Sequence, residues 1–225
     1  MQPGFQVLKR KSTVDQEWVE KFAQIPVANI SDSMSRMSAG GNSLRPMHAS
    51  GVMCGPALTV KVRPGDNLMV HMALNLAVEG DVIVVDASGD LTNAIIGERM
   101  LAYCVAKKFA GMVIYGAVRD YGWIRQQNFP VYASGISHRG PYKDGPGEIN
   151  VPISIGGMVV NPGDLIIGDE DGLLSIDQHE AAALYPKAAA KFKHESETFT
   201  AIGKGDNDAA GYKAKLIKLG CFFED

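Results

Sequence analysis

The sequence predicts an α/β fold in which a parallel βαβ unit lies beside a group of short strands, followed by a C-terminal helical arm. Residues 82–86 and 112–115 are continuous apolar runs, typical of strands buried on both faces, and an amphipathic stretch separates them. Short strand patterns punctuated by Gly and Pro fill residues 151–176. From Asp177 onward the pattern is helical. Together these patterns favour a sheet-rich sandwich over a doubly wound sheet.

Composition limits the class of protein. With 225 residues, 46% of them apolar, and no low-complexity linker, the chain is expected to form one domain over residues 1–225, with residues 177–225 as the arm. The net charge of −3 and the lack of a basic cluster argue against nucleic-acid binding. No apolar run reaches membrane-spanning length, so no membrane partner is expected. Three widely spaced cysteines without zinc-binding spacing predict reduced thiols in the cytoplasm.

Two short helices are expected near the N-terminus. Thr13 is predicted to cap a helix over residues 14–24, with Gln16 completing a capping box. A second helix is expected to begin at residues 31–32. Asp32 is interpreted there as the cap rather than as a catalytic residue, because an Asp at a helix start accepts backbone N–H bonds.

A strand region and a helix precede the βαβ unit. Residues 52–63 are expected to form one or two strands, and residues 68–78 a helix. Asn67 is at least as well suited to cap this helix as to contact a substrate. His71, alone on a mostly apolar helix, is interpreted as a packed or hydrogen-bonded core residue.

The centre of the chain is predicted to be strand, helix, strand. The helix is expected over about residues 92–108, because apolar side chains recur there at three- and four-residue spacing. Gly111 is interpreted as its left-handed cap. The second strand leads to Arg119 and Asp120, at a carboxyl strand end where ligands of such sheets collect.

The Arg119–Asp120 pair has two interpretations. It could be a surface ion pair that contributes little to stability. Alternatively, the guanidinium could bind an anionic substrate while the carboxylate holds a hard cation. The part of the preceding helix around Gly97 and Glu98 is a candidate neighbour in that second case. The residues alone leave both interpretations open.

The remaining elements are a short helix, several strands and a long loop. Residues 123–127 are expected to be helical and residues 129–133 a strand. The loop at 135–147 is too long for a plain turn, so a functional or interface role is expected, with His138 and Arg139 as loop or interface residues. The short strands are expected at residues 151–155, 158–160, 164–168 and 172–176.

The arm begins with a capping pattern. Asp177 is a candidate cap with Glu180 three residues later. Pro186 is expected to kink or break the helix. Because the end of the arm has little apolar surface, it is expected to pack on another subunit.

Several spaced motifs resemble one family. Gly97-Glu98, followed by twenty residues and then Arg119-Asp120, resembles the signature of class II pyruvate aldolases of the 4-hydroxy-4-methyl-2-oxoglutarate (HMG) aldolase type. The same family contains the RraA-like regulators of ribonuclease E activity. The further matches are IPVANISDSM at 25–34, GDNLMVHMAL at 65–74, GDVIVVD at 80–86 and NVPISIGGMVVNPGDLIIGDEDG at 150–172. The resemblance covers nearly the whole chain.

The resemblance implies a fold, an assembly and a metal site. The fold is a β/β/α sandwich of the swivelling-domain kind, assembled as a homotrimer or homohexamer with the site between subunits. Asp120 would bind Mg²⁺ or Mn²⁺ directly, and Glu98 would hold a water on that metal. Glu195 of the neighbouring subunit's arm best matches a second water-mediated contact, with Glu197 as the alternative.

The resemblance also implies the substrate contacts. Arg119 would contact the keto acid, and Asn67 corresponds to the family's Asn in the GDN motif. The substrate carboxylate would be bound by backbone amides at the start of the helix, those of Gly97, Glu98, Arg99 and Met100. Many family members carry an acidic residue where this chain has Trp123. That departure bears on hydrogen bonding around the pocket rather than on the metal ligand.

The implied activity is that of a lyase. A divalent metal and a guanidinium stabilise the pyruvate enolate that retro-aldol cleavage of an HMG-type 2-keto acid produces. Oxaloacetate decarboxylation forms the same enolate, so it is expected as a second activity. The alternative is an RraA-like regulator that binds an endoribonuclease without catalysis. The retained Arg119, Asp120 and Glu98 favour the enzyme. A methyltransferase is disfavoured, because no G-x-G-rich loop follows a first strand.

Overall fold

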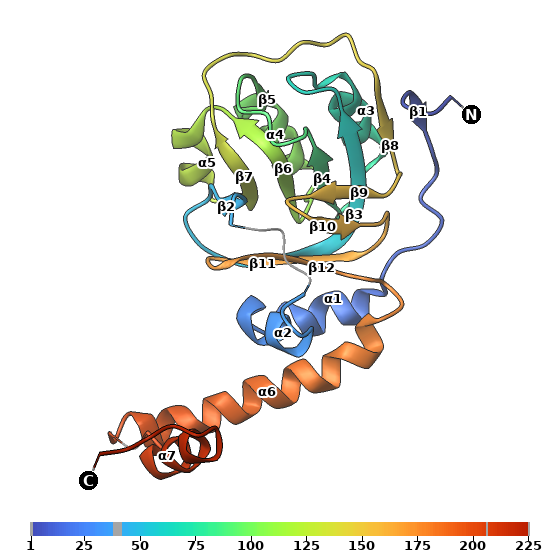
Figure 1. Cartoon of the computed structure of the whole chain (residues 1–225). Coiled ribbons are helices and arrows are strands. Elements are labelled where there is room, and N and C mark those ends of the chain that lie inside the picture. Colours follow the sequence, from blue (N-terminus) through green and yellow to red (C-terminus); the bar gives the residue numbers. More distant parts are fainter. Residues whose placement is uncertain (1, 38–41, 206, 225) are drawn as a thin grey trace.

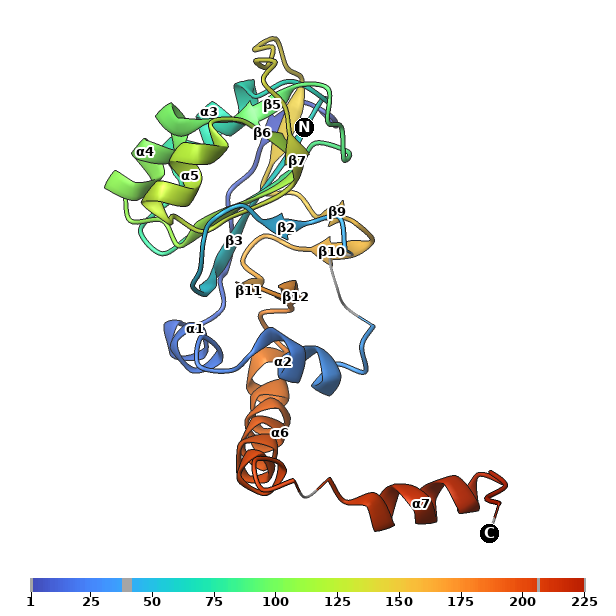
Figure 2. The same ribbon diagram turned by 90° about the vertical axis from the view of Figure 1, so that its left-hand side faces the viewer.

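The body of the molecule is a layered sandwich in which one large sheet is covered on both faces. The computed structural model describes residues 2–37, 42–205 and 207–224. Helices cover one face of the large sheet, and a small two-stranded sheet covers the other (Figures 1 and 2). The helices are α1 (Gln16–Phe22), α2 (Val27–Ser33), α3 (Leu68–Leu76), α4 (Glu98–Ala106), α5 (Tyr121–Gln127), α6 (Ala181–Ile202) and α7 (Ala209–Lys218).

The strands include all of the predicted ones together with several short additions. They are β1 (Gln6–Val7), β2 (Arg45–Pro46), β3 (Met53–Val62), β4 (Val82–Asp86), β5 (Ala94–Ile96), β6 (Gly111–Val118), β7 (Val131–Ile136), β8 (Gly147–Ile149), β9 (Ile153–Ile155), β10 (Met158–Val160), β11 (Leu165–Asp169) and β12 (Gly172–Ile176). The predicted α/β sandwich is confirmed. Strands β1, β2, β5 and β8 are short and were not expected from the pattern.

Four parallel strands form the centre of the large sheet, in the order β3, β4, β6, β7. Val84 of β4 is paired with Thr59 of β3 on one side and with Val113 of β6 on the other. All five residues of β4 are buried, as the continuous apolar run predicts. Because the four strands are parallel, their carboxyl ends meet at one edge of the sheet.

Three apolar cores correspond to the layers. Side chains of β4 alternate between two of them: Ile83 and Val85 face helices α3, α4 and α5, whereas Val82 and Val84 face β9 and β10. The third core lies between β11–β12 and helices α1, α2 and α6. Figure 2 shows the layers in this order. Among the described residues, no helix is both long and apolar enough to cross a bilayer.

The predicted helix at residues 92–108 is wrong in its first part. Ala94–Ile96 form strand β5, which pairs in parallel with the end of β6, and the helix begins only at Glu98. The two isoleucines satisfy helical spacing and strand preference alike, so the pattern could not separate them. Gly111 is not a left-handed cap either. It begins β6, and the residue with a positive φ after the helix is Lys108, at 54°.

The predicted helix starts near the N-terminus are also wrong. Helix α1 begins at Gln16 after Asp15, and its N-terminus has no side-chain cap. Helix α2 starts after Pro26, so Asp32 lies in its last turn instead of capping a new helix. There Asp32 binds Arg36 and Lys191. Its role is therefore an ion pair to the arm.

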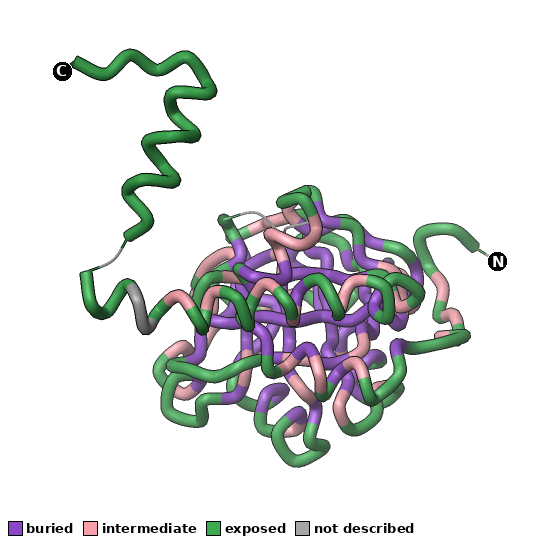
Figure 3. Tube along the Cα trace, turned by 90° about the horizontal axis from the view of Figure 1, so that it is seen from below, coloured by how far each residue is buried: buried purple, intermediate pink, exposed green. Residues whose placement is uncertain are grey.

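The arm leaves the body after β12. Asp177 accepts the N–H of His179 in a turn, whereas Glu180 occupies the position just before α6, so the predicted capping box is wrong. Of the expected kink or break at Pro186, the break is wrong, because α6 runs through Pro186 as one helix. Its first half packs on α1 and α2, but α7 has no buried residue. Figure 3 shows α7 as an exposed segment away from the body.

Candidate functional site

The site is built where two neighbouring strands end. Strand β6 ends at Val118, and Arg119 and Asp120 follow directly. Strand β5 ends beside it at Ile96, whose carbonyl accepts the backbone N–H of Arg119 at 3.0 Å. Gly97 and helix α4 come next. The unexpected strand β5 is therefore what brings the start of α4 to the Arg119–Asp120 pair.

Gly97 permits a close contact that a side chain would prevent. The backbone N–H of Glu98 donates to Asp120 Oδ2 at 2.9 Å. A Cβ atom on Gly97 would overlap Asp120 Oδ2 and would lie 2.8 Å from Arg119 Cγ. Its backbone is extended, so conformational freedom is not the reason for glycine here. The absence of a side chain is what allows the two segments to meet.

Asp120 holds an unusual backbone conformation. Its φ is 58° and its ψ is 39°, the left-handed region, which L-residues other than Asn and Asp seldom adopt. It precedes helix α5, yet its side chain makes no capping bond to that helix. The carboxylate is directed to Glu98 instead. A residue held in this way costs roughly 1–3 kcal/mol, which is typical of functional positions.

The Arg119–Asp120 pair is loose and partly open to solvent. Arg119 Nε lies 3.7 Å from Asp120 Oδ2, and the two side chains are 42% and 34% exposed. Such a pair contributes little to stability. Asp120 Oδ1 has no hydrogen-bond partner among the described residues. The geometry therefore leaves one carboxylate oxygen available to a ligand.

The donor set fits a hard cation that keeps its waters. The described residues contain no group of three or more His, Cys, Asp or Glu side chains placed to hold a metal. A single carboxylate is nevertheless enough for Mg²⁺, which is often bound by one or two carboxylates together with substrate and water. Asp120 Oδ1 has the chemistry and the open position that such a ligand requires. Glu98, whose backbone N–H donates to Asp120, has an exposed side chain with no hydrogen-bond or ion-pair partner among the described residues.

Asn67 is not a helix cap, although it directly precedes α3. Its side chain is buried and donates to the carbonyl of Ile95 at 2.8 Å, and the residue is only 2% exposed. Its Oδ1 atom is buried without a hydrogen-bond partner. An unsatisfied buried acceptor costs about 1–3 kcal/mol. The amide thus offers an acceptor that a ligand could satisfy. Asp66 performs the capping, by accepting the N–H of Leu68.

Asp66 also fixes the long loop against the site. This fully buried carboxylate accepts the N–H groups of Asp144 at 2.7 Å and Gly145 at 3.0 Å, and it pairs with Arg63. A second attachment joins the loop to β5, through the N–H of Ala94 and the carbonyl of Arg139 at 2.8 Å. The predicted loop therefore has an ordered course. Its role as one wall of a pocket follows from this attachment.

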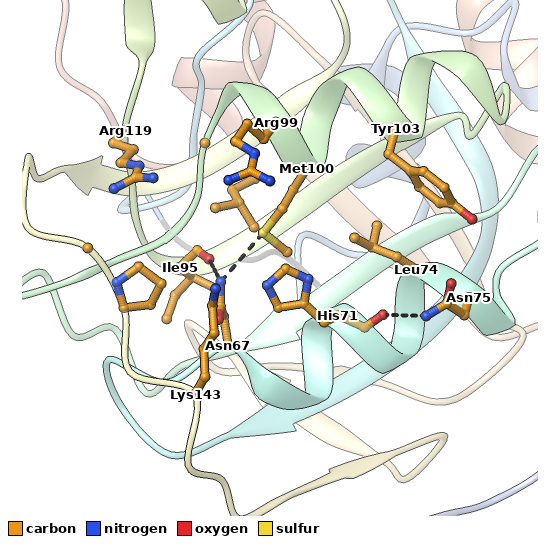
Figure 4. Close-up of a pocket in the computed structure, with 14 residues that line it drawn as sticks. Asn67, His71, Leu74, Asn75, Ile95, Arg99, Met100, Tyr103, Arg119 and Lys143 are labelled. Atoms are coloured by element: carbon orange, nitrogen blue, oxygen red, sulfur yellow. Dashed lines mark hydrogen bonds between the residues drawn. The ribbon is translucent and has the colours of Figure 1, made fainter.

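A pocket of about 520 Å³ opens at this place between α3, α4 and the loop. Figure 4 shows its labelled side chains, with Arg99, Arg119 and Lys143 as the cationic ones. No Asp or Glu lines it among the described residues. The pocket therefore favours an anionic ligand. The lining residues are Asn67, His71, Leu74, Asn75, Ile95, Ile96, Gly97, Arg99, Met100, Tyr103, Arg119, Gly140, Pro141 and Lys143.

His71 lines the pocket instead of packing in the core, so the interpretation from the sequence is wrong. Burial and, to a lesser degree, the charges of Lys143 and Arg99 hold the pKa of His71 below its usual value. The imidazole is consequently neutral at neutral pH. Sequence reasoning also missed Lys143. Its place in a polar loop gave no signal, because only the attachment by Asp66 brings it to the pocket.

Four of the amides implied for the carboxylate lie in one turn, but two of them already have partners. The N–H of Glu98 binds Asp120, and the N–H of Met100 binds the carbonyl of Gly97 at 3.1 Å. The N–H of Arg99 has no partner among the described residues. Arg99 therefore contributes both a free amide and a guanidinium to the pocket.

Other predicted residues lie outside the pocket lining. His138 and Arg139 are exposed on the loop and do not line the pocket. Trp123, in the first turn of α5, packs against the core. Its backbone N–H donates to the Asp120 carbonyl. Its indole does not line the pocket. The substitution for an acidic residue therefore adds apolar packing beside Asp120.

Glu195 lies on α6, at the end of the molecule opposite the pocket (Figure 1). Within this chain it accepts a hydrogen bond from Asn29 and pairs with Lys191 at 3.1 Å. Those partners lower the pKa of its carboxyl, the contact with Asn29 most strongly. Glu197 is more exposed and lies 3.9 Å from Lys193. Both arm glutamates lie on α6, which Figure 1 shows away from α5, the helix that follows Asp120.

The cysteines take no part in this site. Burial raises the pKa of the Cys54 and Cys104 thiols to about 12, so neither forms a thiolate near neutral pH. Cys221 is exposed beyond α7. All three are free, as the spacing predicts.

Comparison with known proteins gives one consistent result. A model of RraA-like proteins, described as Aldolase/RraA, matches residues 27–174. A Halalkalibacterium halodurans protein, provisionally named 4-hydroxy-4-methyl-2-oxoglutarate aldolase, is 36% identical over 206 residues, covering 92% of this chain and 98% of that protein. A Thermus thermophilus protein named 4-hydroxy-4-methyl-2-oxoglutarate aldolase is 34% identical over 113 residues, covering 50% of this chain and 69% of that protein.

A solved structure agrees in fold. Streptomyces coelicolor RraAS2 is described as an unusual member of the RNase ES inhibitor RraA protein family. Its crystal structure superposes with a TM-score of 0.76 at 23% identity, covering 83% of this chain and 98% of that chain. At this identity the likeness concerns the fold alone.

Proposed function

The chain belongs to the RraA-like family, and on that premise we propose that it is a divalent-metal-dependent lyase that releases pyruvate from HMG-type 2-keto acids. The observation that carries the proposal is the contact of Gly97 and the Glu98 amide with Asp120, at the edge of a cationic pocket. This contact leaves Asp120 Oδ1 open to a cation, and Arg119 lies beside that carboxylate. Relatives named HMG aldolase support the same class of reaction.

In this proposal the protein binds the keto acid through fixed donors. The substrate carboxylate takes the free N–H of Arg99 at the first turn of α4, where the helix dipole favours an anion. Arg119 faces the keto oxygen, where negative charge develops. When bound by Asp120, Mg²⁺ or Mn²⁺ would supply further positive charge at that oxygen. The buried Oδ1 of Asn67 accepts a hydrogen bond from the bound molecule.

The chemical step is a retro-aldol cleavage. The C4 hydroxyl loses its proton, the C3–C4 bond breaks, and its electron pair forms the pyruvate enolate while C4 becomes a carbonyl. A proton then returns to C3 and yields pyruvate. We assign the proton transfers to Glu98, acting through water, because its exposed carboxylate follows Gly97 directly. In oxaloacetate, loss of CO₂ leaves the same enolate without a proton transfer from a hydroxyl.

The complete site would include a neighbouring subunit. The arm holds its glutamates far from the pocket of its own chain, so Glu195 or Glu197 can act only on another copy. A homotrimer or homohexamer gives each pocket one such arm. We place the enzyme in the cytoplasm, in keeping with its three free cysteines.

The proposal is tested by pyruvate release from HMG and from oxaloacetate, with Mg²⁺ and again with EDTA. EDTA-sensitive release from both supports the lyase. Release from oxaloacetate alone would replace the aldolase assignment by that of a decarboxylase. No release from either substrate by folded protein with metal present would contradict the proposal. Binding to an endoribonuclease would then become the assignment to test.

A further inference from the structure

The pocket continues well past the place of the keto acid. Asn67, His71 and Asn75 follow at four-residue spacing from the start of α3, and Gly97, Arg99 and Tyr103 line the pocket from the start of α4. At 1.5 Å per residue, the stretch from residue 67 to 75 spans about 12 Å and that from 97 to 103 about 9 Å. Figure 4 shows Arg119 and Tyr103 at opposite ends of the lining side chains. The three carbons of pyruvate, at about 1.5 Å per bond, occupy only the Arg119 end.

The Tyr103 end of the pocket differs chemically from the Arg119 end. Leu74, Asn75 and Tyr103 form it, and we call these three residues the distal end. Leu74 is 6% exposed, and the half-buried ring of Tyr103 packs edge-on against Phe109 with 6.4 Å between centroids. The Asn75 amide donates to the carbonyl of His71 at 3.0 Å, so that donor is occupied.

The charged groups near the distal end point to an apolar occupant. The ammonium of Lys107 lies 5.7 Å from the centroid of the Tyr103 ring, but Lys107 does not line the pocket. The lining cations lie toward the other end in Figure 4, where the keto acid would bind. A leucine side chain and a tyrosine ring offer contact area rather than ionic recognition.

The volume leaves room for such an occupant. A cavity of about 150 Å³ is sufficient for a benzene molecule. The pocket measures about 520 Å³, so a keto acid head and a six-membered ring can be accommodated together. Leu74, Met100 and Tyr103 line the pocket and provide apolar contacts for such a ring.

We propose that the distal end binds an apolar substituent on C4 of the substrate, so that the substrate class includes 4-hydroxy-2-keto acids carrying an aryl or branched alkyl group. This inference rests on the lyase assignment and extends it. In 4-hydroxy-2-oxo-4-phenylbutanoate, the C4 hydroxyl proton leaves and the C3–C4 bond breaks, giving benzaldehyde. The electron pair remains as the pyruvate enolate, which takes a proton at C3. No oxidant or additional reactant is needed.

The test compares this phenyl substrate with oxaloacetate in the wild type and in two variants. Asn75→Trp narrows the distal end from an exposed position, so the fold should be retained. Val105→Trp is the matched control, because Val105 is 43% exposed on α4 and does not line the pocket. We expect the wild type to cleave the phenyl substrate. Asn75→Trp should lower the ratio of kcat/KM for phenyl substrate over oxaloacetate at least about 10-fold, a typical effect of lost apolar contact.

The outcomes separate the two proposals. If the wild type cleaves oxaloacetate but not the phenyl substrate, or if Asn75→Trp leaves the ratio as in Val105→Trp, the distal-end proposal is overturned and the lyase stands. If neither substrate nor HMG yields pyruvate, the lyase itself is contradicted. If Tyr103→Phe keeps the wild-type ratio of kcat/KM for phenyl substrate over oxaloacetate, the result further supports contact with the Tyr103 ring. If that ratio falls, recognition is assigned to the Tyr103 hydroxyl instead.

Discussion

The strand-end site and the C-terminal arm represent two opposite uses of the chain. Around the site, buried strands and a buried carboxylate hold Gly97, Asp120 and the loop in fixed places. In the arm, α7 has no buried residue, and the fully buried residues of the preceding helix, Ala181 and Ala188, lie in its first half. The chain therefore fixes the strand-end part of the site by its own packing, whereas α7 has no such packing within the described chain.

Left-handed backbone conformations occur in both regions, but in different surroundings. Asp120 sits in the left-handed region directly after the buried end of β6, where packing can enforce it. In α7 the same region is used by Asp208, at an exposed helix start. Strain at the site is thus held by the core. The first prediction tests that link.

Gly97→Ala is expected to have the largest effect. The added Cβ would overlap Asp120 Oδ2 and press on Arg119, so the two side chains must separate from the Glu98 amide. We expect kcat/KM for pyruvate release to fall at least about 100-fold, equivalent to roughly 2.7 kcal/mol. Steady-state kinetics together with a thermal melt measure this.

Gly122→Ala is the control for that variant. Gly122 lies in α5, and a Cβ there would meet no atom within 4 Å. It should leave activity unchanged and raise stability slightly, because alanine favours helix. If Gly97→Ala were as active as Gly122→Ala, the contact between Gly97 and Asp120 could not be the basis of the site.

The second prediction concerns the arm. Glu195→Ala protein and Arg119→Ala protein should each be nearly inactive, whereas subunit exchange between them should restore activity. With random exchange, a site needs its own intact Arg119 and an intact Glu195 from one neighbour. The expected recovery is therefore at most about one quarter of the wild-type rate.

If activity does not recover after subunit exchange, the proposal that the arm completes a neighbouring site is contradicted. Exchange is verified by mass spectrometry of a mixture in which one variant is isotopically labelled. If the mixed oligomers are present but remain inactive, Glu195 lies outside the shared site. Repeating the experiment with Glu197→Ala then decides between the two glutamates of the arm.

Asp66→Asn should lower the stability of the body of the molecule more than that of the C-terminal arm. The substituted amide would place N–H donors against the N–H groups of Asp144 and Gly145, which now share one carboxylate oxygen. We expect a loss of about 2 kcal/mol in the free energy of unfolding, the usual cost of a buried unsatisfied group. Denaturant unfolding measures it. Asp144→Asn is the control, since that side chain is 71% exposed; equal losses would refute the role of Asp66.

The smallest effect is expected from acid on the arm. Lys191 lowers the pKa of Asp32, and Asn29 and Lys191 lower that of Glu195. Since both pKa values are lower in the folded state, the stabilisation is complete above the unfolded values near pH 4 and disappears as pH falls through the folded ones. Lys191→Met should therefore lower the melting temperature slightly at pH 7, and by progressively less as the pH falls below the unfolded values. Lys193→Met, at an 80% exposed position, should leave the melting temperature unchanged over this range.

The sequence predicted the centre of the fold better than its site. Continuous apolar runs identified β4 and β6, because burial on both faces requires them. The two isoleucines of β5 fit a helix as well as a strand, so their pattern does not identify the strand. Their strand state depends on pairing with the end of β6, a contact that no local pattern encodes. The position of Arg119 and Asp120 at a strand end was predictable, and Gly97 and Glu98 were candidate neighbours, but the bond from the Glu98 amide to Asp120 was not predicted.

The pocket lining was predictable only in part. Asn67 and the start of α4 came from the family resemblance, but His71 was assigned to the core and Lys143 to an undefined loop. Both depend on long-range contacts: Asp66 holds the loop that carries Lys143, and the pKa of His71 is lowered first by burial and then by the charges of Lys143 and Arg99. The attachment of Gly145 to Asp66 joins residues 79 positions apart. Hydrophobic periodicity contains no information on them.

Exchange of the pyruvate methyl protons with D₂O tests the central claim most directly, because it requires only enolate formation and no knowledge of the natural substrate. With Mg²⁺, the wild type and Asp90→Asn should catalyse exchange, whereas Asp120→Asn should not. Asp90 is a fair control, since its carboxylate likewise accepts a backbone N–H and does not line the pocket. Exchange by Asp120→Asn at the wild-type rate would contradict the assigned role of this carboxylate and, with it, the account of the site.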